Sequence, residues 1–389
     1  YVRGTQANEI YHLQPESILK GRYIIGKVVG YGGFGVTYIA WDNLLEKKVA
    51  VKEYFPSEFA TRMPGHTEVT IFSGDREEQF ASGKDKFEDE AKRLVRFNET
   101  PGIVTVFDTF VENNTAYIVM EFLEGRSLKQ YIDEKGKLSV DETLEIIIPV
   151  LEALCFVHKE GIIHRDIAPD NIFLCDDGSV KLIDFGASRF ATTKHSKSLS
   201  VILKPGYSPV EQYRSKGDQG PWTDVYSVAA TFYKAITGVT PMDSMERDVK
   251  DGLKEPSKLG VKINKSTENS LMNALNIRIE GRTQTAEAFL EDLRAEEVKR
   301  IKIKNKKMDI GKWPLWTKIS ASVASVAIIG FLVLLATGVI SFNITGLKKN
   351  VLPEGTTRIP NVINLSVDEA QIKCLVEKAE KEELFNMSQ

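Results

Sequence analysis

Apolar and polar side chains alternate along residues 23–55 and again along 103–122. A period of two residues is typical of strands with one buried face. The first stretch is broken by a glycine cluster and by a polar turn, so it predicts an antiparallel meander of three strands. The second stretch predicts two further strands, at 103–112 and 115–122.

Other parts of the chain show helical spacing. Residues 77–97 carry apolar side chains about 3.5 positions apart, which predicts one helix beside these strands. Further helices are predicted at 127–135, 140–159 and 223–238. Short runs at 171–178 and 180–186 are typical of a small hairpin. The pattern predicts an α+β chain of two lobes, the first small and rich in strands with one helix, the second larger and helical.

Residues 319–340 form a run of 22 residues without a charged side chain. Because about 20 apolar residues can cross the hydrocarbon core of a bilayer as a helix, we predict a single transmembrane helix here. The alternative is a buried core helix. Eight basic residues lie within 299–318 and three within 341–358. By the positive-inside rule, the N-terminal part is expected to be cytoplasmic and the C-terminal part to lie outside the cell membrane.

Composition sets limits on the partners. The 389 residues carry 51 basic and 54 acidic side chains, a net charge of −3. The chain therefore lacks a global positive field, and we expect no nucleic-acid partner. The three cysteines have no CxxC spacing, which argues against a zinc site or a disulfide framework.

A glycine-rich segment, GYGGFGVTYIA, lies at the first turn of the meander. Its glycines have no Cβ atoms, so the backbone can approach phosphate oxygens closely and direct amides at them. They are Gly30, Gly32, Gly33 and Gly35. In dinucleotide-binding turns of the same spacing a helix follows, whereas an alternating strand follows here. The alternative is an ordinary tight turn.

Five charged or polar residues further along can complete a phosphotransfer site. Lys52 lies inside an apolar strand, where an ammonium group needs a phosphate or carboxylate partner, and Glu90 lies on the helix that follows. Asn171 and Asp184 offer oxygen ligands to a divalent metal ion. Asp166 then remains to orient an incoming hydroxyl and accept its proton.

These residues occur in order with HRD at 164–166, DFG at 184–186, SPVE at 208–211, DVYS at 224–227 and Arg282. In content and spacing, the series resembles the eukaryotic-type (Hanks-type) protein serine/threonine kinases of bacteria. The resemblance covers about residues 20–296 and implies the two-lobed protein kinase fold. It also implies ATP and Mg²⁺, with Mn²⁺ as the alternative metal, and protein substrates.

The resemblance assigns a role to each residue. Lys52 is expected to bind the α and β phosphates with Glu90 as its ion-pair partner, Asp166 to act as base, and Asn171 and Asp184 to hold the metal. The expected adenine site has Met120 as gatekeeper and a hinge from Glu121 to Leu123. Glu211 and Arg282 are expected to form a structural ion pair.

The segment 187–211 resembles an activation loop for protein substrates, which favours a protein kinase over a small-molecule kinase. It is rich in hydroxyl groups, at Thr192, Thr193, Ser196, Ser198 and Ser200. We expect autophosphorylation here, with Arg165 available to pair with the added phosphate. The competing interpretation is a pseudokinase scaffold, although the lysine, the base and the metal aspartate are all present.

Two features depart from the family pattern. Lys52 and Glu90 are 38 positions apart, which indicates an insertion at 56–75, either a hairpin or a loop, that offers a regulatory or homodimer contact. Ala168 stands where most serine/threonine members carry a lysine that meets the γ-phosphate. We hypothesise that Lys204 has taken over this charge and reaches toward Asp166; the alternative is an exposed lysine in a mobile loop.

The C-terminal segment from about residue 358, RIPNVINLSVDEAQIKCLVEKAE, resembles half of a PASTA module, which implies binding of peptidoglycan fragments. An ordinary amphipathic helix is the alternative. The expected organisation is an N-terminal extension (1–20), trimmed at its start, a kinase domain (21–297), a basic juxtamembrane linker (298–318), a transmembrane helix (319–340) and an extracellular tail (341–389).

Overall fold

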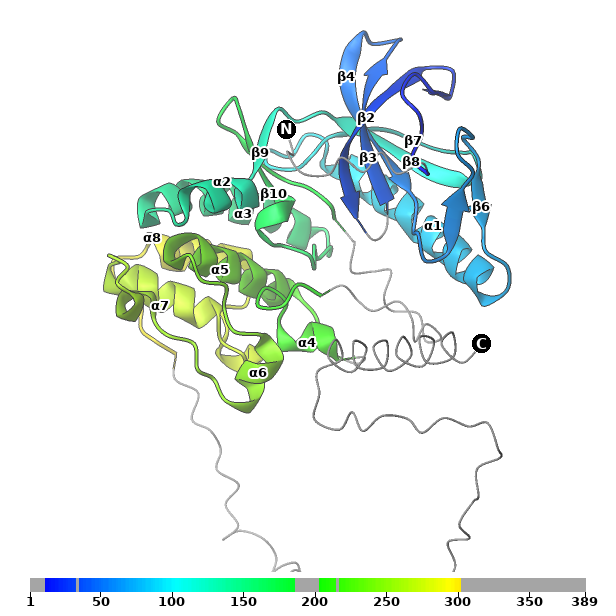
Figure 1. Cartoon of the computed structure of the whole chain (residues 1–389). Helices are drawn as coiled ribbons and strands as arrows, with labels where there is room; N and C mark the ends of the chain where they lie inside the picture. Colours follow the sequence, from blue (N-terminus) through cyan, green and yellow to red (C-terminus); the bar gives the residue numbers. More distant parts are fainter. Residues whose placement is uncertain (1–10, 33–34, 186–202, 215–216, 302–389) are drawn as a thin grey trace, which may run out of the picture. The chain divides into compact units, whose positions relative to one another are not determined.

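The structure is a computed structural model that describes residues 11–32, 35–185, 203–214 and 217–301 (Figure 1). These residues form a strand-rich lobe, which ends at Glu121, and a helical lobe, which begins at Leu128. The predicted α+β class and two-lobed fold are confirmed.

The N-terminal lobe is built on a six-stranded antiparallel sheet in the order β1-β2-β3-β4-β8-β7. Its strands are β1 (Ile18–Leu19), β2 (Tyr23–Gly32), β3 (Gly35–Asp42), β4 (Lys47–Tyr54), β7 (Val106–Glu112) and β8 (Thr115–Glu121). The predicted meander and the later strand pair are confirmed. The register places Lys52 in the middle of the sheet, between Thr37 of β3 and Ile118 of β8.

One long helix, α1 (Asp75–Leu94), packs against β7 and β8 and is followed by a 3₁₀ turn at Val95–Phe97. It buries the apolar side chains whose spacing predicted it: Phe80, Phe87, Ala91 and Leu94. A Cβ atom at Gly83 would lie 2.0 Å from the Tyr54 hydroxyl oxygen. Only glycine therefore allows this close approach of helix and sheet.

The inserted segment forms a hairpin of β5 (Ala60–Arg62) and β6 (Val69–Ile71), located next to α1 in Figure 1. Its anchor is Arg62, whose guanidinium is fully buried and pairs with the carboxylate of Glu53 on β4. Tyr38 and Tyr117 donate their hydroxyls to the same carboxylate, at 2.9 and 2.8 Å. Arg62 also donates to the carbonyl oxygen of Tyr11, at 2.9 Å. The buried charges are thus paired and hydrogen-bonded, which is what makes their burial tolerable.

The second lobe contains most of the helices. They are α2 (Leu128–Lys135), α3 (Val140–Lys159), α4 (Val210–Tyr213), α5 (Pro221–Thr237), α6 (Ser244–Val249), α7 (Lys265–Ala274) and α8 (Ala286–Arg294). Four of them begin at a side chain that accepts a hydrogen bond from the backbone N–H three residues later: Ser127, Ser139, Asn264 and Thr285. Such N-caps satisfy amides that have no partner inside the helix.

Helix α5 lies at the centre of this lobe and packs against α3, α7 and α8. Most of its side chains are buried, including the polar Asp224 and Ser227. It begins with Pro221 and ends at Gly238, which has a φ of 73° and is left-handed. A buried helix of this kind is a rigid support for groups bonded to it.

A small sheet in the order β11-β10-β9 lies beside α2 and contains the predicted hairpin. It consists of β9 (Gly125–Ser127), β10 (Ile172–Cys175) and β11 (Val180–Leu182). Asn171 ends the 3₁₀ turn before β10, and Asp184 follows β11 by two residues. The N–H of Ile183 donates to the Asn171 carbonyl oxygen at 3.1 Å, so the hairpin brings the two predicted metal ligands together.

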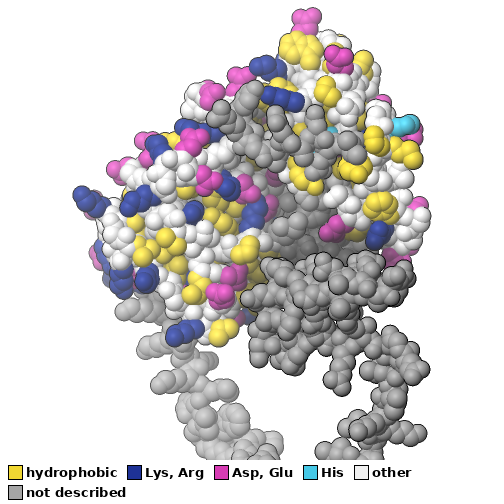
Figure 2. Space-filling view, viewed as in Figure 1, with side chains coloured by type: hydrophobic (Ala, Val, Ile, Leu, Met, Phe, Trp, Pro, Cys, Tyr) yellow, Lys and Arg dark blue, Asp and Glu magenta, His cyan; other side chains and the backbone are white. Residues whose placement is uncertain are grey.

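Several expectations fall outside the described residues. They concern Gly33, the loop from 186 to 202, most of the basic linker, the segment 319–340 and the tail. Within the described ranges, none of the helices has the length and apolar character needed to cross a bilayer. Basic and acidic side chains are interspersed on the face shown in Figure 2.

The buried pair of Arg62 and Glu53 predicts a stability effect. Replacement of Arg62 by methionine leaves the Glu53 carboxylate buried without its cation. We expect Arg62→Met to lower the free energy of unfolding by about 3–5 kcal/mol, measured by urea denaturation.

The matched control is Lys48→Met on the same strand, because Lys48 forms an exposed pair with Glu124. This change is expected to cost less than about 1 kcal/mol. Equal losses in the two variants would contradict a special role for the buried pair.

Candidate active site

The glycine segment is the hairpin between β2 and β3, in which Gly32 pairs with Gly35. A Cβ atom at Gly35 would lie 2.1 Å from the Glu53 carbonyl oxygen, so this glycine is required by the neighbouring strand. At Gly32, by contrast, a Cβ atom would meet no atom within 4 Å. Packing does not require glycine at that position, which leaves room over the hairpin for a group such as a phosphate.

Lys52 does not form the predicted ion pair with Glu90. Its ammonium group contacts the Asp184 carboxylate instead. Burial opposes the charge on Lys52, but the field of the Asp184 carboxylate and its contact with the ammonium group outweigh it, so the Lys52 pKa is raised. The same contact lowers the pKa of Asp184, against the effect of burial. The expected ion pair is thus corrected to one between Lys52 and Asp184.

The pKa of Glu90 is in keeping with this difference. Burial raises the pKa of Glu90 to about 8, and the field of Lys52 offsets only part of the effect. A carboxyl group with this pKa is mostly protonated at pH 7. The spacing along the chain predicted Glu90 as the partner, but the folded structure brings the Asp184 carboxylate to Lys52.

Asp166 lies in the loop that joins α3 to the 3₁₀ turn at Pro169–Asn171. The side chain of Asn171 donates to both the carbonyl oxygen and Oδ2 of Asp166, at 2.7 and 2.8 Å. Burial raises the pKa of Asp166 to about 6, and the opposing effect of Lys204 limits the rise. A carboxylate with this pKa is ionised at pH 7 yet basic enough to accept a proton, which suits a general base.

The backbone of this loop is held by Asp224 of α5. Its carboxylate accepts from the N–H groups of His164 and Arg165, at 2.8 and 2.7 Å, and bonds to His158 Nε2 at 2.8 Å. These bonds hold the Asp224 pKa low despite complete burial. Arg165 has a φ of 69° and Asp184 a φ of 58°, conformations that non-glycine residues rarely adopt. Such strain persists only where neighbours enforce it.

Lys204 reaches the catalytic loop. Its Nζ lies 3.2 Å from Asp166 Oδ1 and 3.0 Å from the Asp170 carboxylate. The hypothesis from the sequence therefore has the geometry it requires. The sequence analysis did not predict Asp170 as a partner of Lys204. The only indication in the sequence is that an acidic residue stands four positions after the base.

The expected adenine site lies where β8 leaves the sheet. Met120 and Glu121 end this strand. Both the backbone and the side chain of Glu121 are hydrogen-bonded. Its N–H donates to the Thr105 carbonyl oxygen, and its carboxylate accepts from Lys181 at 2.6 Å. Among the described residues, the N–H of Leu123 has no hydrogen-bond acceptor. It is therefore a donor suited to a ring nitrogen such as those of adenine.

Three further residues with predicted roles are Glu211, Arg282 and Arg165. Glu211 and Arg282 form the predicted buried ion pair, with Arg282 Nη1 2.6 Å from Glu211 Oε1. Gln212, which the sequence analysis did not single out, donates to the Arg165 carbonyl oxygen at 2.7 Å. Arg165 Nε is buried and has no partner among the described residues. The loop that was expected to supply a phosphate to it lies outside them.

The structure also allows a test of the expected metal ligands. Asn171 turns its Nδ2 toward Asp166, so its amide oxygen is directed away from that carboxylate. Asp184 adds a second hard oxygen donor. In the described part of the chain, no group of three or more His, Cys, Asp or Glu side chains is arranged to hold a metal ion. The oxygen atoms of Asn171 and Asp184 fit a magnesium ion, which in such sites takes its other ligands from phosphates and water.

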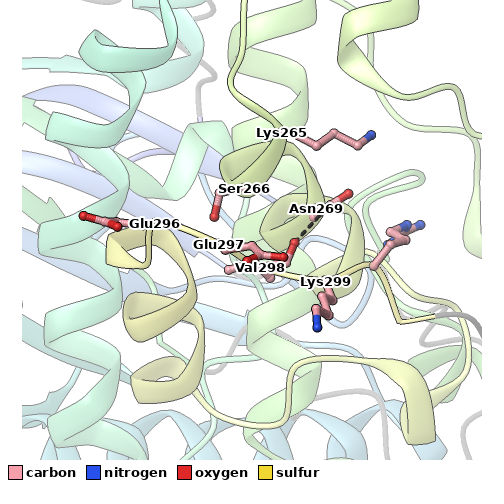
Figure 3. A pocket seen from close by; sticks show the side chains of 8 residues that line it. Lys265, Ser266, Asn269, Glu296, Glu297, Val298 and Lys299 are labelled. Carbon is pink, nitrogen blue, oxygen red and sulfur yellow. Dashed lines mark hydrogen bonds between the residues drawn. The ribbon is translucent and has the colours of Figure 1, made fainter.

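A separate cavity of about 420 Å³ lies between the start of α7 and residues 296–300 (Figure 3). Asn269 on its wall donates to the Val298 carbonyl oxygen at 2.8 Å. Basic and acidic side chains both line it, and none of the predicted site residues does. The cavity lies where residues 296–300 pass α7, and it is not part of the candidate active site.

The described residues form a two-lobed arrangement that fits a phosphotransferase. One lobe has a glycine hairpin and a largely buried lysine, and the other has the predicted base, Asp166, with the predicted metal ligands, Asn171 and Asp184. A family model for the protein kinase domain matches residues 23–307. The chain belongs to the protein kinase family, in its bacterial serine/threonine (Hanks-type) branch.

Individual relatives are named as serine/threonine-protein kinases. A probable serine/threonine-protein kinase of Clostridium acetobutylicum is 30% identical over 285 residues, which are 71% of this chain and 40% of that protein. Serine/threonine-protein kinase PknL of Mycobacterium tuberculosis is 34% identical over 226 residues, which are 58% of this chain and 51% of that protein. The chain thus spans about half or less of the length of these curated relatives.

A solved structure described as the PpkA-294 apo form superposes with a TM-score of 0.66. It is 30% identical and covers 73% of this chain and 99% of its own. The matched region is thus a complete domain of that structure.

The raised pKa of Glu90 predicts a pH-dependent stability. The folded state holds a proton on Glu90 up to about pH 8, whereas the unfolded state releases it near 4.5. The folded state therefore binds more protons in this window, and its stability falls as pH rises through it. We expect Glu90→Gln to make the loss between pH 5 and pH 8 less steep, as measured by urea unfolding at each pH.

Glu78→Gln is the control, because Glu78 lies in the first turn of the same helix and is exposed. Its pH dependence should follow that of the unmodified chain. A Glu90→Gln variant with an unchanged slope would show that Glu90 is ionised in the folded protein.

Proposed function

We propose that this chain is an ATP-dependent protein serine/threonine kinase that acts on itself and on other proteins. The observation that carries the proposal is that Lys52 of the strand-rich lobe contacts Asp184 of the helical lobe, while Asn171, bonded to Asp166, is joined to the residue before Asp184. The family assignment supports it, and so does the presence of every residue that is expected to take part in catalysis. The names of the relatives support serine and threonine as acceptors.

The transfer follows from the geometry. The acceptor hydroxyl is oriented by Asp166 and gives it a proton while its oxygen forms a bond to the γ-phosphorus. The bond from that phosphorus to the β–γ bridging oxygen breaks, and its electron pair leaves with ADP. Lys52 holds the α and β phosphates, and the Leu123 N–H holds the adenine ring. Positioning and electrostatics supply most of the rate.

Asn171 and Asp184 would hold the magnesium ion, which neutralises charge on the phosphates when bound. The Asp184 carboxylate that pairs with Lys52 in this structure would also be a ligand of the metal, so nucleotide binding is expected to move Lys52 from this carboxylate to the phosphates. The donors are all oxygen, which favours Mg²⁺ or Mn²⁺ over softer metals.

The test of this function is replacement of the base. Asp166→Asn keeps the shape and removes the proton acceptor, so transfer of labelled phosphate from MgATP to the chain itself and to casein should fall by about 10²–10⁴-fold. Nucleotide affinity, measured by calorimetry, should change little. Phosphoamino acid analysis should find phosphoserine or phosphothreonine.

Lys258→Ala provides the control, since Lys258 is 68% exposed and remote from the site in sequence. The alternative function is a pseudokinase scaffold. Unmodified protein that binds MgATP but labels neither itself nor casein would support that alternative and overturn the kinase proposal.

We further propose that the chain is a single-pass receptor of the cell membrane. The uncharged run at 319–340 and the basic residues that precede it support this arrangement, with the kinase domain in the cytoplasm. The PASTA-like tail would then face the cell wall and bind peptidoglycan fragments, and the β5–β6 hairpin is a candidate homodimer contact.

Expression of the full chain and of residues 1–304 in bacteria tests the anchor. The full chain should sediment with membranes and resist extraction by salt and alkali, because a transmembrane helix is held by apolar contacts. The shorter chain should remain in the supernatant. A full chain that alkali releases would contradict the anchor without touching the kinase proposal.

A further inference from the structure

The ammonium group of Lys204 lies between two carboxylates of the catalytic loop. It is 3.2 Å from Asp166 Oδ1 and 3.0 Å from Asp170. These aspartates lie two positions before and two positions after Ala168, whose side chain is only a buried methyl group. The ammonium group therefore lies beside the stretch of loop that contains Ala168. The site thus has a positive charge beside its base, supplied from a different segment.

The backbone of Lys204 is held in place. Its carbonyl oxygen accepts from the N–H groups of Tyr207 and Ser208, both at 3.0 Å, and its own N–H donates to Ser208 Oγ at 3.2 Å. Ser227 of α5 donates to the Tyr207 carbonyl oxygen at 3.0 Å, and Ser244 of α6 to that of Ser208 at 2.7 Å. The lysine therefore extends from a turn tied to two helices and is only 22% exposed. This geometry argues against an idle lysine on a mobile loop.

The position of this charge suits the transfer. The reacting γ-phosphoryl group must lie within reach of a hydroxyl bonded to Asp166, and Lys204 Nζ already lies within hydrogen-bond distance of that carboxylate. A lysine ammonium carries three donors, so it can contact Asp166, Asp170 and a phosphate oxygen at the same time. It also lowers the Asp166 pKa, which burial alone would raise further.

We propose that Lys204 is a catalytic residue that contacts the γ-phosphoryl group in place of the lysine absent at position 168, and that Asp170 is the positioning residue that holds its ammonium group. The inference rests on the proposed kinase function. Proton, phosphoryl group and leaving electron pair follow the course given above. The contribution of Lys204 is a fixed positive charge next to the oxygens that move from ATP to the acceptor.

The first experiment removes the charge. Lys204→Met keeps most of the apolar stem, and we expect kcat to fall about 10²-fold with a small change in KM for ATP, because the lost contact acts on the group in transit. A lysine with a merely structural role would change thermal stability or the KM for ATP together with kcat, whereas loss of a contact to the transferred group lowers kcat alone.

The second experiment relocates the charge. The double variant Lys204→Met/Ala168→Lys places a lysine where the family pattern has it, and it should regain at least about tenfold of the lost kcat. Asp170→Asn should lower kcat about fivefold, less than Lys204→Met does, and leave the KM for ATP unchanged, because Lys204 keeps its contact with Asp166. Lys258→Ala is again the control, and thermal unfolding checks that each variant is folded.

The outcomes separate the two proposals. If the unmodified chain transfers no phosphate, the kinase function itself fails. If it is active but Lys204→Met retains its kcat, the inference about Lys204 is wrong while the kinase function stands. A rise in activity would show that Lys204 restrains Asp166, which also overturns the inference. If the double variant fails to fold, the kcat and the KM for ATP of the single variant still decide.

Discussion

The catalytic loop depends on one buried carboxylate. Asp224 lies in the first turn of α5 and accepts hydrogen bonds from two successive N–H groups of the loop, at 2.8 and 2.7 Å. An aspartate buried in this way is stable only while its donors remain in place, and the donors are the loop itself. The strained backbone of Arg165 is therefore maintained by the need to satisfy a charge. The position of Asp166 follows from this constraint.

The charges of the site form one pair and one cluster of three. Lys52 contacts Asp184, and Lys204 contacts Asp166 and Asp170. Glu90 belongs to neither group, and burial raises its pKa. Each cation thus offsets the negative charge of at least one carboxylate. A nucleotide can enter such a site by an exchange of partners, in which its phosphates take the place of a carboxylate beside an ammonium group.

The sequence alone predicted much of the fold. The strands of the meander and helix α1 have clear periods of two and about 3.5 residues, and both were confirmed. Helix α7 was missed because its buried face includes Glu268, Asn269 and Asn273, so no apolar stripe marks it. Buried polar residues are tolerated only through partners elsewhere, as where Asn273 donates to the Lys299 carbonyl oxygen at 2.9 Å. Such partners have no signature in a local pattern.

The identities and order of Lys52, Asp166, Asn171 and Asp184 were readable from the sequence, because the chemistry of phosphate and metal demands these residue types. The sequence also showed that Ala168 lacks a charge and that Lys204 could replace it. Only the tertiary structure decided which carboxylate pairs with Lys52 and that Asp170 shares the ammonium group of Lys204. The physical reason is that pairing depends on distance and burial, and both are set by segments that lie more than thirty positions apart in the chain.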